Sequence, residues 1–382
     1  MSESTTLAIT ARAAEMRAQG RPVLSLSAGE PDFGTPEAVA RAGIAAIEAG
    51  LTGYTAAAGL PELRRAIAAH LGREYGLAYE PAEVCVTASV KPALSLALTA
   101  LLEPGDKVVI QAPYWVSYPD IVRLAGGEPA VLETGVDGGF LPTEDALAEA
   151  MAAEGVRGIL LNTPSNPTGA VWDERLLTTL VGLCRERDQW ILSDEIYSRV
   201  VYEGWAHRSP AAIPGGHELT IHVDGLSKAY AMTGWRIGWI AGPREPVAAI
   251  AAIQSHVLGN APTVSQYAAL EALSERGSAY PQQMLEAFAE RRAWLIEAVG
   301  ALPGFRLSEP RGAFYLFPDV SEVCARRGTD DVALARTLLE EVEVAVVPGT
   351  AFGSPGHLRL SFAASLGVLQ AAIGRIADWL AR

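Results

Sequence analysis

One lysine in this sequence stands in a setting suited to chemistry. It is Lys228, in the stretch DGLSKAYAMTGWRIG (224–238), and lysine is scarce, because the chain holds only Lys91, Lys107 and Lys228. Small residues flank Lys228, an apolar run precedes it, and Arg236 follows closely. A lysine in a dry pocket has a lowered pKa and can attack a carbonyl to form a Schiff base, and an arginine fork suits phosphate. A surface lysine is the commoner alternative, but this setting favours a ligand that carries both a carbonyl and a phosphate.

Pyridoxal phosphate is such a ligand, and its other requirements match further residues. Its ring nitrogen needs a carboxylate to stay protonated, and Asp194 ends an apolar run, although a helix N-cap is the alternative for this residue. Tyr197 and Asn166 could hold the ring oxygen, and Trp115 could cover the ring face. The phosphate would lie on backbone N–H groups at a helix start, which the stretch ASVKPAL (88–94) offers. The set indicates one cofactor site.

These residues need a scaffold that brings them together. Short apolar runs alternate with helical stretches such as 91–102 and 173–188, which predicts crossover units and a mostly parallel sheet with helices on both faces, an α/β fold. The predicted strands are 83–87, 107–111, 157–162, 190–193, 220–224 and 236–242. Ligands of such sheets bind at the carboxyl ends of the strands. The loops with candidate residues follow these strands, so we expect them to form one site.

A second, smaller α+β unit is expected toward the end of the chain. A long amphipathic helix (about 282–300) leads to short strand-like runs. These runs are FRLS, AFYLF, VEVAVV and HLRLSFA, with helices predicted over 330–341 and 365–381. The N-terminal segment is expected to join this unit. The prediction is therefore a large cofactor-binding domain over 35–285 and a small domain formed by 1–34 and 286–382.

Composition excludes several classes of function. The chain has 382 residues and a net charge of -14, which argues against nucleic acid and against an anionic membrane surface as partners. No signal peptide or membrane-spanning stretch is expected. The three cysteines are isolated, which favours a reducing cytoplasm over a disulfide framework. There is no GxGxxG or P-loop, and the histidines of HELTIH (217–222) are spaced wrongly for a metal pair, so we expect no metal site.

Taken together, the motifs are characteristic of a known family. They are SAGEPDF, GYTAAAGLPELR, APYWVSYP, NTPSNPTG, SDEIY, SKAYAMTGWRIG, RGAFY, VVPGTAFG and HLRLSFA. In this order and spacing, the chain resembles the class I pyridoxal-phosphate aminotransferases of fold type I, and among them the bacterial I-gamma aspartate aminotransferases. The resemblance covers nearly the whole chain. It implies an enzyme that moves an amino group from an L-amino acid to a 2-oxo acid by ping-pong kinetics, with pyridoxal 5'-phosphate as cofactor.

The resemblance also implies a role for each matching residue. The catalytic residues would be Lys228 as covalent anchor and proton carrier, Asp194 facing the ring nitrogen and Tyr197 at the ring oxygen. The other cofactor-binding residues would be Ser89, Val90, Lys91, Trp115, Asn166, Ser227 and Arg236. Tyr54 would reach the phosphate of a neighbouring subunit, which implies a homodimer with shared sites. Gly29, Asn166 and Arg359 would hold the substrate α-carboxylate, although a surface ion pair is the alternative for Arg359. Trp115 would also contact the substrate.

The substrate is less clearly indicated. The resembled subgroup reads the distal carboxylate of aspartate or glutamate with a lysine and a threonine, and Lys91 and Thr6 match those positions. Their alternatives are a residue of the helix start and a helix N-terminal residue. Aromatic, broad-specificity or prephenate aminotransferase activity, a pyridoxal-phosphate β-lyase and a non-catalytic regulatory module remain alternatives.

Two departures from the family pattern bear on the cofactor site. Ser89 and Val90 replace the usual loop glycines, and we expect Val90 to restrict the loop. Gly225 stands where serine is common, so Ser227 is the expected source of that hydroxyl.

Overall fold

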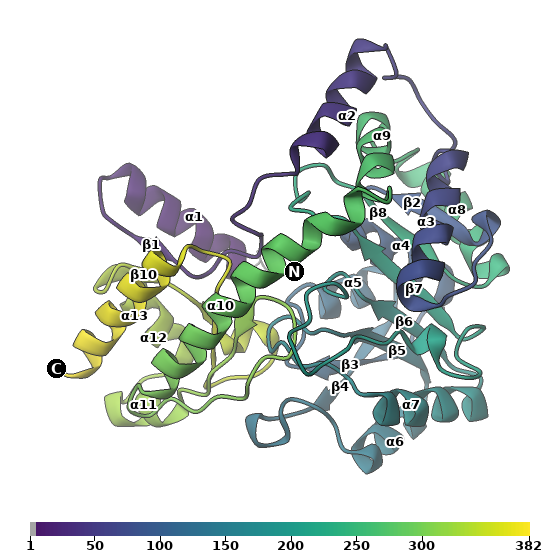
Figure 1. The fold of residues 1–382 in the computed structure, drawn as a ribbon. Helices are drawn as coiled ribbons and strands as arrows, with labels where there is room; N and C mark the ends of the chain where they lie inside the picture. The colour runs from purple at the N-terminus through teal and green to yellow at the C-terminus, as the bar shows by residue number, and fades with distance from the viewer. Residues whose placement is uncertain (1–4) are drawn as a thin grey trace.

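A seven-stranded sheet forms the centre of the molecule, as seen in a computed structural model that describes residues 5–382 (Figure 1). The spatial order is β2 (Val84–Thr87), β8 (Gly238–Ala241), β7 (Thr220–Gly225), β6 (Trp190–Asp194), β5 (Val156–Asn162), β3 (Lys107–Ala112) and β4 (Glu128–Glu133). The run from β7 to β4 is parallel, and β8 is antiparallel to both of its neighbours. The predicted α/β fold with a mostly parallel sheet is confirmed.

Both faces of the inner part of this sheet are buried, because successive side chains of its central strands enter different apolar clusters. In β3, Val108 and Ile110 join one cluster, whereas Val109 joins another. In β6, Leu192 and Ile191 divide in the same way. One face is covered by α4 (Val90–Leu101), α5 (Tyr118–Leu124) and α8 (Arg244–Val257), and the other by α3 (Pro61–Tyr75), α6 (Glu144–Ala152) and α7 (Glu174–Arg187). This two-sided burial explains why central strands such as β3 and β6 are mostly apolar.

The N-terminal and C-terminal segments pack together beside the large sheet. Helix α1 (Thr5–Ala18) and strand β1 (Leu24–Ser25) lie with the C-terminal elements, because β1 pairs in parallel with β10 (Val344–Ala345) (Figure 1). The C-terminal elements are α10 (Tyr280–Gly300), β9 (Tyr315–Leu316), α11 (Ser321–Arg327), α12 (Asp331–Glu340), β11 (Val347–Pro348), β12 (Leu358–Ser361) and α13 (Leu366–Leu380). Strands β11, β12 and β9 form an antiparallel sheet. This mixture agrees with the expected α+β unit.

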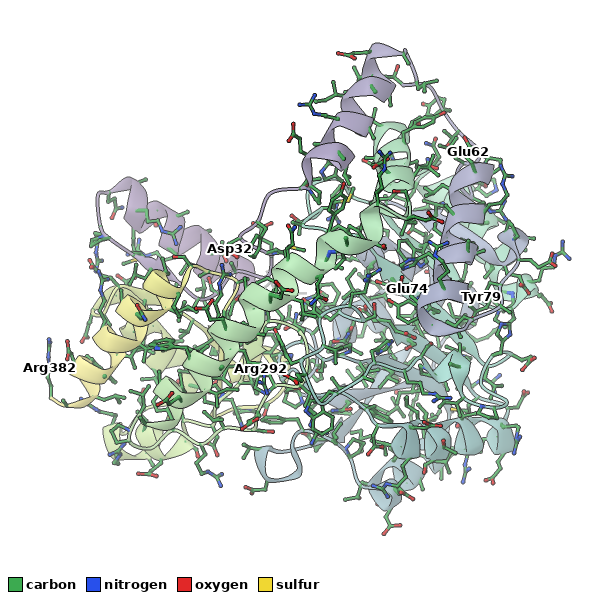
Figure 2. The ribbon with its side chains drawn as sticks, viewed as in Figure 1. Asp32, Glu62, Glu74, Tyr79, Arg292 and Arg382 are labelled. Carbon is green, nitrogen blue, oxygen red and sulfur yellow. The ribbon has the colours of Figure 1, made fainter. Side chains whose placement is uncertain are left out.

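The two parts are joined by long segments rather than by a short linker. Two further helices, α2 (Glu37–Glu48) and α9 (Thr263–Ala272), pack against each other. Asp32, labelled in Figure 2, forms an ion pair with Arg291 of α10 at 2.7 Å.

Helix α10 runs continuously through residue 285, so the domain division at that residue stays a prediction. None of the helices in the described part of the chain has the length and apolar character needed to span a membrane.

The predicted strands differ from the structure in a few places. The run 236–242 forms a strand only from Gly238, because Arg236 has a left-handed backbone with φ of 54°. FRLS forms no strand and contributes one bridge, between Arg306 and Asp319. Strand β4 was not predicted, because it is a half-exposed edge strand whose Pro129 and flanking glutamates weaken the apolar pattern.

Candidate active site

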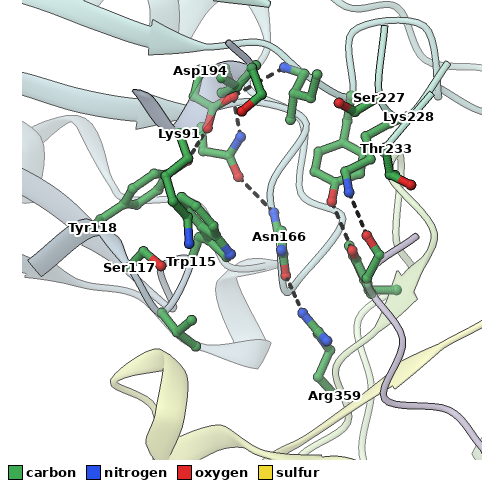
Figure 3. A pocket seen from close by; sticks show the side chains of 18 of the residues that line it. Lys91, Trp115, Ser117, Tyr118, Asn166, Asp194, Ser227, Lys228, Thr233 and Arg359 are labelled. Carbon is green, nitrogen blue, oxygen red and sulfur yellow. Dashed lines mark hydrogen bonds between the residues drawn. The ribbon is translucent and has the colours of Figure 1, made fainter. Parts of the chain in front are cut away.

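A cavity of about 320 Å³ opens where the loops from the carboxyl ends of the parallel strands meet the small α+β unit (Figure 3). All of the predicted site residues line it except Tyr54 and Thr6. The predicted lining residues are Gly29, Ser89, Val90, Lys91, Trp115, Asn166, Asp194, Tyr197, Ser227, Lys228, Arg236 and Arg359. The prediction that loops distant in sequence form a single site is therefore correct in its geometry.

Lys228 is not a surface lysine. It follows β7, and its Nζ donates to the backbone oxygen of Gly29 at 2.5 Å. Burial lowers the pKa of Lys228 to about 8, against an opposing contribution from Glu30. A substantial fraction of this amine is therefore neutral near physiological pH, which is the form that can attack a carbonyl or accept a proton.

Asp194 ends β6 and is buried at the same edge of the sheet. Its Oδ2 accepts from the hydroxyl of Tyr118 at 2.7 Å, and its Oδ1 accepts from the backbone N–H of Ile196 at 3.3 Å. Burial raises the pKa of Asp194 to about 6, and the two hydrogen bonds oppose that rise. No helix begins at this residue, so the N-cap alternative is wrong. Asp194 is a buried carboxylate that faces a cavity.

The start of α4 forms a cradle for an anion. Ser89 immediately precedes this helix and has φ of 88°, a backbone conformation in which side chains other than that of glycine are strained. Its Oγ accepts from Nη2 of Arg236 at 2.5 Å. Val90 is the first residue of the helix, and the strained backbone lies at Ser89 before it, so the expected restriction of the loop by Val90 stays a prediction. The free N–H groups of this helix start and the Arg236 guanidinium can bind one phosphate.

Glycine at position 225 is explained by close packing. A Cβ on Gly225 would lie 2.9 Å from the backbone oxygen of Ile237 and 3.0 Å from Cα of Gly238. A serine therefore does not fit at this position. Ser227, which is buried and lines the cavity, is the hydroxyl that this segment presents instead.

Arg359 lies in β12 and is 2% exposed, which rules out the surface ion pair. Its Nη1 donates to Oδ1 of Asn166 at 3.0 Å, and its Nη2 donates to the backbone oxygen of Ser27 at 2.8 Å. Its Nε is buried without a partner in the described part of the chain. A buried guanidinium without a carboxylate partner has unused capacity for an anion. The side chain is therefore poised to receive one from the cavity.

Aromatic side chains complete the walls. The hydroxyl of Tyr197 lies 2.8 Å from that of Tyr315, and the guanidinium of Arg359 lies over the Tyr315 ring at 4.5 Å from its centre. The Nζ of Lys91 lies 4.8 Å from the centre of the Trp115 ring. Burial and the charge of Arg236 lower the pKa of Lys91. The wall at Trp115 thus combines a flat apolar surface with a cation.

Two predicted residues are not brought into the cavity. Tyr54 is fully exposed, and the side chain of Thr6 lies outside the residues whose side chains the structure describes. Conversely, Tyr118 and Tyr315 line the cavity and were not predicted. Both tyrosines occur inside the matching motifs APYWVSYP and RGAFY, so the motifs contained the signal, but only the fold reveals their direction.

Comparison with known proteins decides the family. The family model for class I and II aminotransferases matches residues 21–376. The chain belongs to the class I and II aminotransferase family. Its relatives include the aspartate/prephenate aminotransferase of Cereibacter sphaeroides, 45% identical over 98% of this chain and 95% of that protein, and the aspartate aminotransferase of Geobacillus stearothermophilus, 42% identical over 98% and 96%.

Solved structures agree with this assignment. The aspartate aminotransferase of Thermus thermophilus with maleate superimposes with a TM-score of 0.94, at 43% identity over 99% of this chain and 97% of that one. The aspartate aminotransferase of Rhizobium meliloti gives 0.95 at 40% identity, over 100% and 97%. The fold is therefore fold type I, and the chain is a pyridoxal-phosphate-dependent aminotransferase. The β-lyase and regulatory-module alternatives are not favoured.

The cavity fits this cofactor. Among the described residues, four cationic side chains line it, Lys91, Lys228, Arg236 and Arg359, against the one carboxylate of Asp194. The chain as a whole carries a charge of -14. The excess of cations in the cavity suits a phosphate together with a carboxylate substrate. A buried amine of lowered pKa, a buried carboxylate and a helix start beside an arginine are the donors and acceptors that pyridoxal phosphate requires.

Proposed function

We propose that this aminotransferase acts on aspartate and glutamate and their 2-oxo acids, with Lys228 as its covalent anchor and proton carrier. The observation that carries the proposal is that Lys228, Asp194 and Arg359 face one cavity from three separate segments. The cofactor, when bound, supplies a carbonyl for covalent attachment and an aromatic ring that accepts electron density. The protein must then hold this cofactor, hold the substrate and move one proton.

Lys228 is the residue that moves the proton. Its amine would hold the cofactor through the carbonyl that the cofactor supplies, and it would be free to carry a proton once the amino group of the substrate had taken its place. With its pKa lowered to about 8, the released amine can accept the proton from the substrate α-carbon. The same amine can donate this proton again later in the reaction. Asp194 keeps the ring nitrogen protonated by offering a carboxylate in a buried setting. Tyr197 and Asn166, which line the same cavity, would hold and orient the ring oxygen.

Other residues of the cavity would hold the phosphate and the ring of the cofactor in place. The N–H groups at Ser89 and Val90, the hydroxyl of Ser227 and the guanidinium of Arg236 hold the phosphate, and Trp115 stacks on the ring. All of these residues line the cavity, and the Ser89 hydroxyl accepts from the Arg236 guanidinium, which supports this assignment.

Substrate binding divides between two ends of the amino acid. Arg359, with Gly29 and Asn166, binds the α-carboxylate, which the partnerless Nε of Arg359 supports. Lys91 binds the distal carboxylate beside Trp115, with Thr6 as its proposed companion. The acidic substrate is supported by relatives named aspartate aminotransferases and by a neighbouring structure that contains maleate, a dicarboxylate.

We also propose a cytoplasmic homodimer with shared sites. Tyr54 is fully exposed in the single chain, near other exposed apolar residues of α2 and the loop after it, Ile44, Ile47 and Leu51. These exposed apolar residues, close together in the sequence, support a partner surface in this region. In the dimer, Tyr54 would reach the phosphate of the neighbouring subunit. Three buried cysteines without disulfides fit a reducing compartment.

A panel of substrates tests the function. We expect aspartate with 2-oxoglutarate to give the highest kcat/KM, with parallel double-reciprocal lines that indicate ping-pong kinetics. Prephenate is included as a second acceptor, because relatives from Cereibacter sphaeroides and Thermus thermophilus are named aspartate/prephenate aminotransferases. A preference for aromatic donors, or pyruvate and ammonia formed without any acceptor, would contradict the proposal.

A further inference from the structure

Tyr118 makes a direct contact with Asp194 that no step of the proposed function uses. It is the first residue of α5, and its hydroxyl donates to Oδ2 of Asp194 at 2.7 Å. Tyr118 is 2% exposed and Asp194 is 3% exposed, and both line the cavity. Figure 3 shows the two side chains meeting beside Lys91 and Trp115. A buried hydrogen bond to a charged acceptor is short and strong.

We propose that Tyr118 is a positioning residue that keeps the carboxylate of Asp194 ionised and fixed in direction for the ring nitrogen of the cofactor. The inference rests on the proposed role of Asp194. It adds a residue that touches Asp194 and acts on the cofactor through it.

The contacts of Asp194 show why one donor matters. Among the described residues, Tyr118 is the side chain that donates to this carboxylate. The other hydrogen bond comes from the backbone N–H of Ile196 and is longer, at 3.3 Å. The amide of Asn162 donates to the backbone oxygen of Asp194 at 2.9 Å, which anchors the main chain and leaves the carboxylate free. Without Tyr118, the carboxylate would keep a single long hydrogen bond in a buried site.

The surrounding charges do not replace this donor. Burial and the neighbouring carboxylate of Glu195 both favour the protonated acid, whereas Lys228 favours the ionised form. His222 on β7 also interacts electrostatically with Asp194, but it lies against Glu195 at 3.1 Å, and Tyr197 carries no positive charge. Lys228 loses its charge whenever it acts as a base. Tyr118 keeps its proton, because burial and Asp194 raise its pKa well above the ordinary value.

The position of Tyr118 also links two contacts of the cofactor ring. Its backbone N–H donates to the backbone oxygen of Trp115 at 2.9 Å. The two rings meet edge to face, with centres 5.4 Å apart and an angle of 81°. The side chain expected to stack on the ring and the donor to Asp194 are therefore set by one turn of the chain before α5.

Tyr118→Phe removes the hydroxyl and keeps the ring, which makes it the test variant. The matched control is Tyr75→Phe, because the Tyr75 hydroxyl also bonds within the protein, 2.8 Å from Oγ of Ser198, and does not line this cavity. The first measurement is an infrared pH titration of the protein without cofactor, with the Asp194 carboxyl band assigned by its loss in Asp194→Asn. We expect a wild-type midpoint near pH 6 and a midpoint about one pH unit higher in Tyr118→Phe.

The second measurement is the dissociation constant of pyridoxal phosphate near neutral pH. We expect it to rise roughly tenfold in Tyr118→Phe and to stay unchanged in Tyr75→Phe. If Tyr118→Phe fails to fold, a fluorotyrosine placed at position 118 serves instead. Its more acidic phenol should donate more strongly and lower the Asp194 midpoint.

The two measurements separate this inference from the proposed function. The role of Tyr118 is overturned if the Asp194 midpoint moves neither in Tyr118→Phe nor with fluorotyrosine at position 118. This holds whatever the substrates of the enzyme are. A shifted midpoint with equal cofactor affinity also overturns it, because Tyr118 would then act on Asp194 without acting on the cofactor. If the substrate panel fails while both shifts are seen, the proposed substrates are wrong and the role of Tyr118 stands.

Discussion

Arg359 and Asn166 join the two parts of the molecule at the site. Nη1 of Arg359, in β12, donates to Oδ1 of Asn166, in the loop after β5, at 3.0 Å. The hydrogen bond connects the small antiparallel sheet with the edge of the large sheet, and it orients the guanidinium toward the cavity (Figure 3). The proposed binding of the α-carboxylate depends on this orientation.

Replacing Arg359 with lysine should therefore impair the substrate more than the cofactor. Lysine cannot make the two parallel hydrogen bonds of a guanidinium, so about 2 kcal/mol of binding free energy should be lost. This loss corresponds to a decrease of about thirtyfold in kcat/KM for aspartate. Arg375→Lys is the control, because Arg375 bonds the backbone of Pro22 outside the cavity. Equal kcat/KM in wild type and Arg359→Lys would mean that Arg359 does not bind the α-carboxylate of the substrate.

Replacing Ser89 with glycine should make the protein more stable but should weaken its affinity for the cofactor. Ser89→Gly should raise the free energy of unfolding of the cofactor-free protein by about 1 kcal/mol, because glycine tolerates φ of 88°. It should also weaken pyridoxal phosphate binding, because the hydroxyl that meets Arg236 is lost. Denaturant unfolding and cofactor titration measure the two effects. Ser89→Ala separates them, since it should weaken binding without the stabilisation.

Lys91 should discriminate between kinds of substrate. Lys91→Ala should lower kcat/KM for aspartate and glutamate by about tenfold or more, because an ion pair with the distal carboxylate is lost. Tyrosine as donor should be affected far less, since it has no second carboxylate. Steady-state rates with each donor make the comparison. Equal losses for acidic and aromatic donors would mean that Lys91 does not bind the distal carboxylate.

The lowered pKa of Lys228 should be visible in the capture of the cofactor. Only the neutral amine attacks the carbonyl, so the rate at which the cofactor-free enzyme binds pyridoxal phosphate covalently should rise with pH and level off above about 8. An ordinary lysine would keep gaining rate toward about pH 10 and beyond. Stopped-flow absorbance over a pH series gives the midpoint. A midpoint near that of an exposed lysine would contradict the buried setting.

The proximity of the main site residues could be predicted from the sequence, because parallel strands end at one edge of the sheet. Asp194 and Lys228 each follow an apolar strand, so their proximity could be predicted without coordinates. Conformations that depend on tertiary contacts could not be predicted. The left-handed backbones of Ser89 and Arg236 carry no local sign in the sequence. The direction of Tyr118 likewise depends on how α5 packs on the sheet.

The remaining discrepancies have similar causes. Strand β4 pairs on one side only, and its edge position allows a proline and glutamates that mask the strand pattern. Tyr54 matches the family pattern, yet the single chain leaves it in solvent. In the proposed homodimer, it would reach the phosphate of the neighbouring subunit. A property of an assembly has no counterpart in the fold of one chain.

The identity of the covalent anchor tests the account most directly. The enzyme loaded with pyridoxal phosphate would be reduced with borohydride, digested and analysed by mass spectrometry. We predict that the cofactor is found on Lys228, which lines the cavity and donates to the backbone oxygen of Gly29. Cofactor attached to Lys91 or Lys107, or no attached cofactor at all, would contradict it.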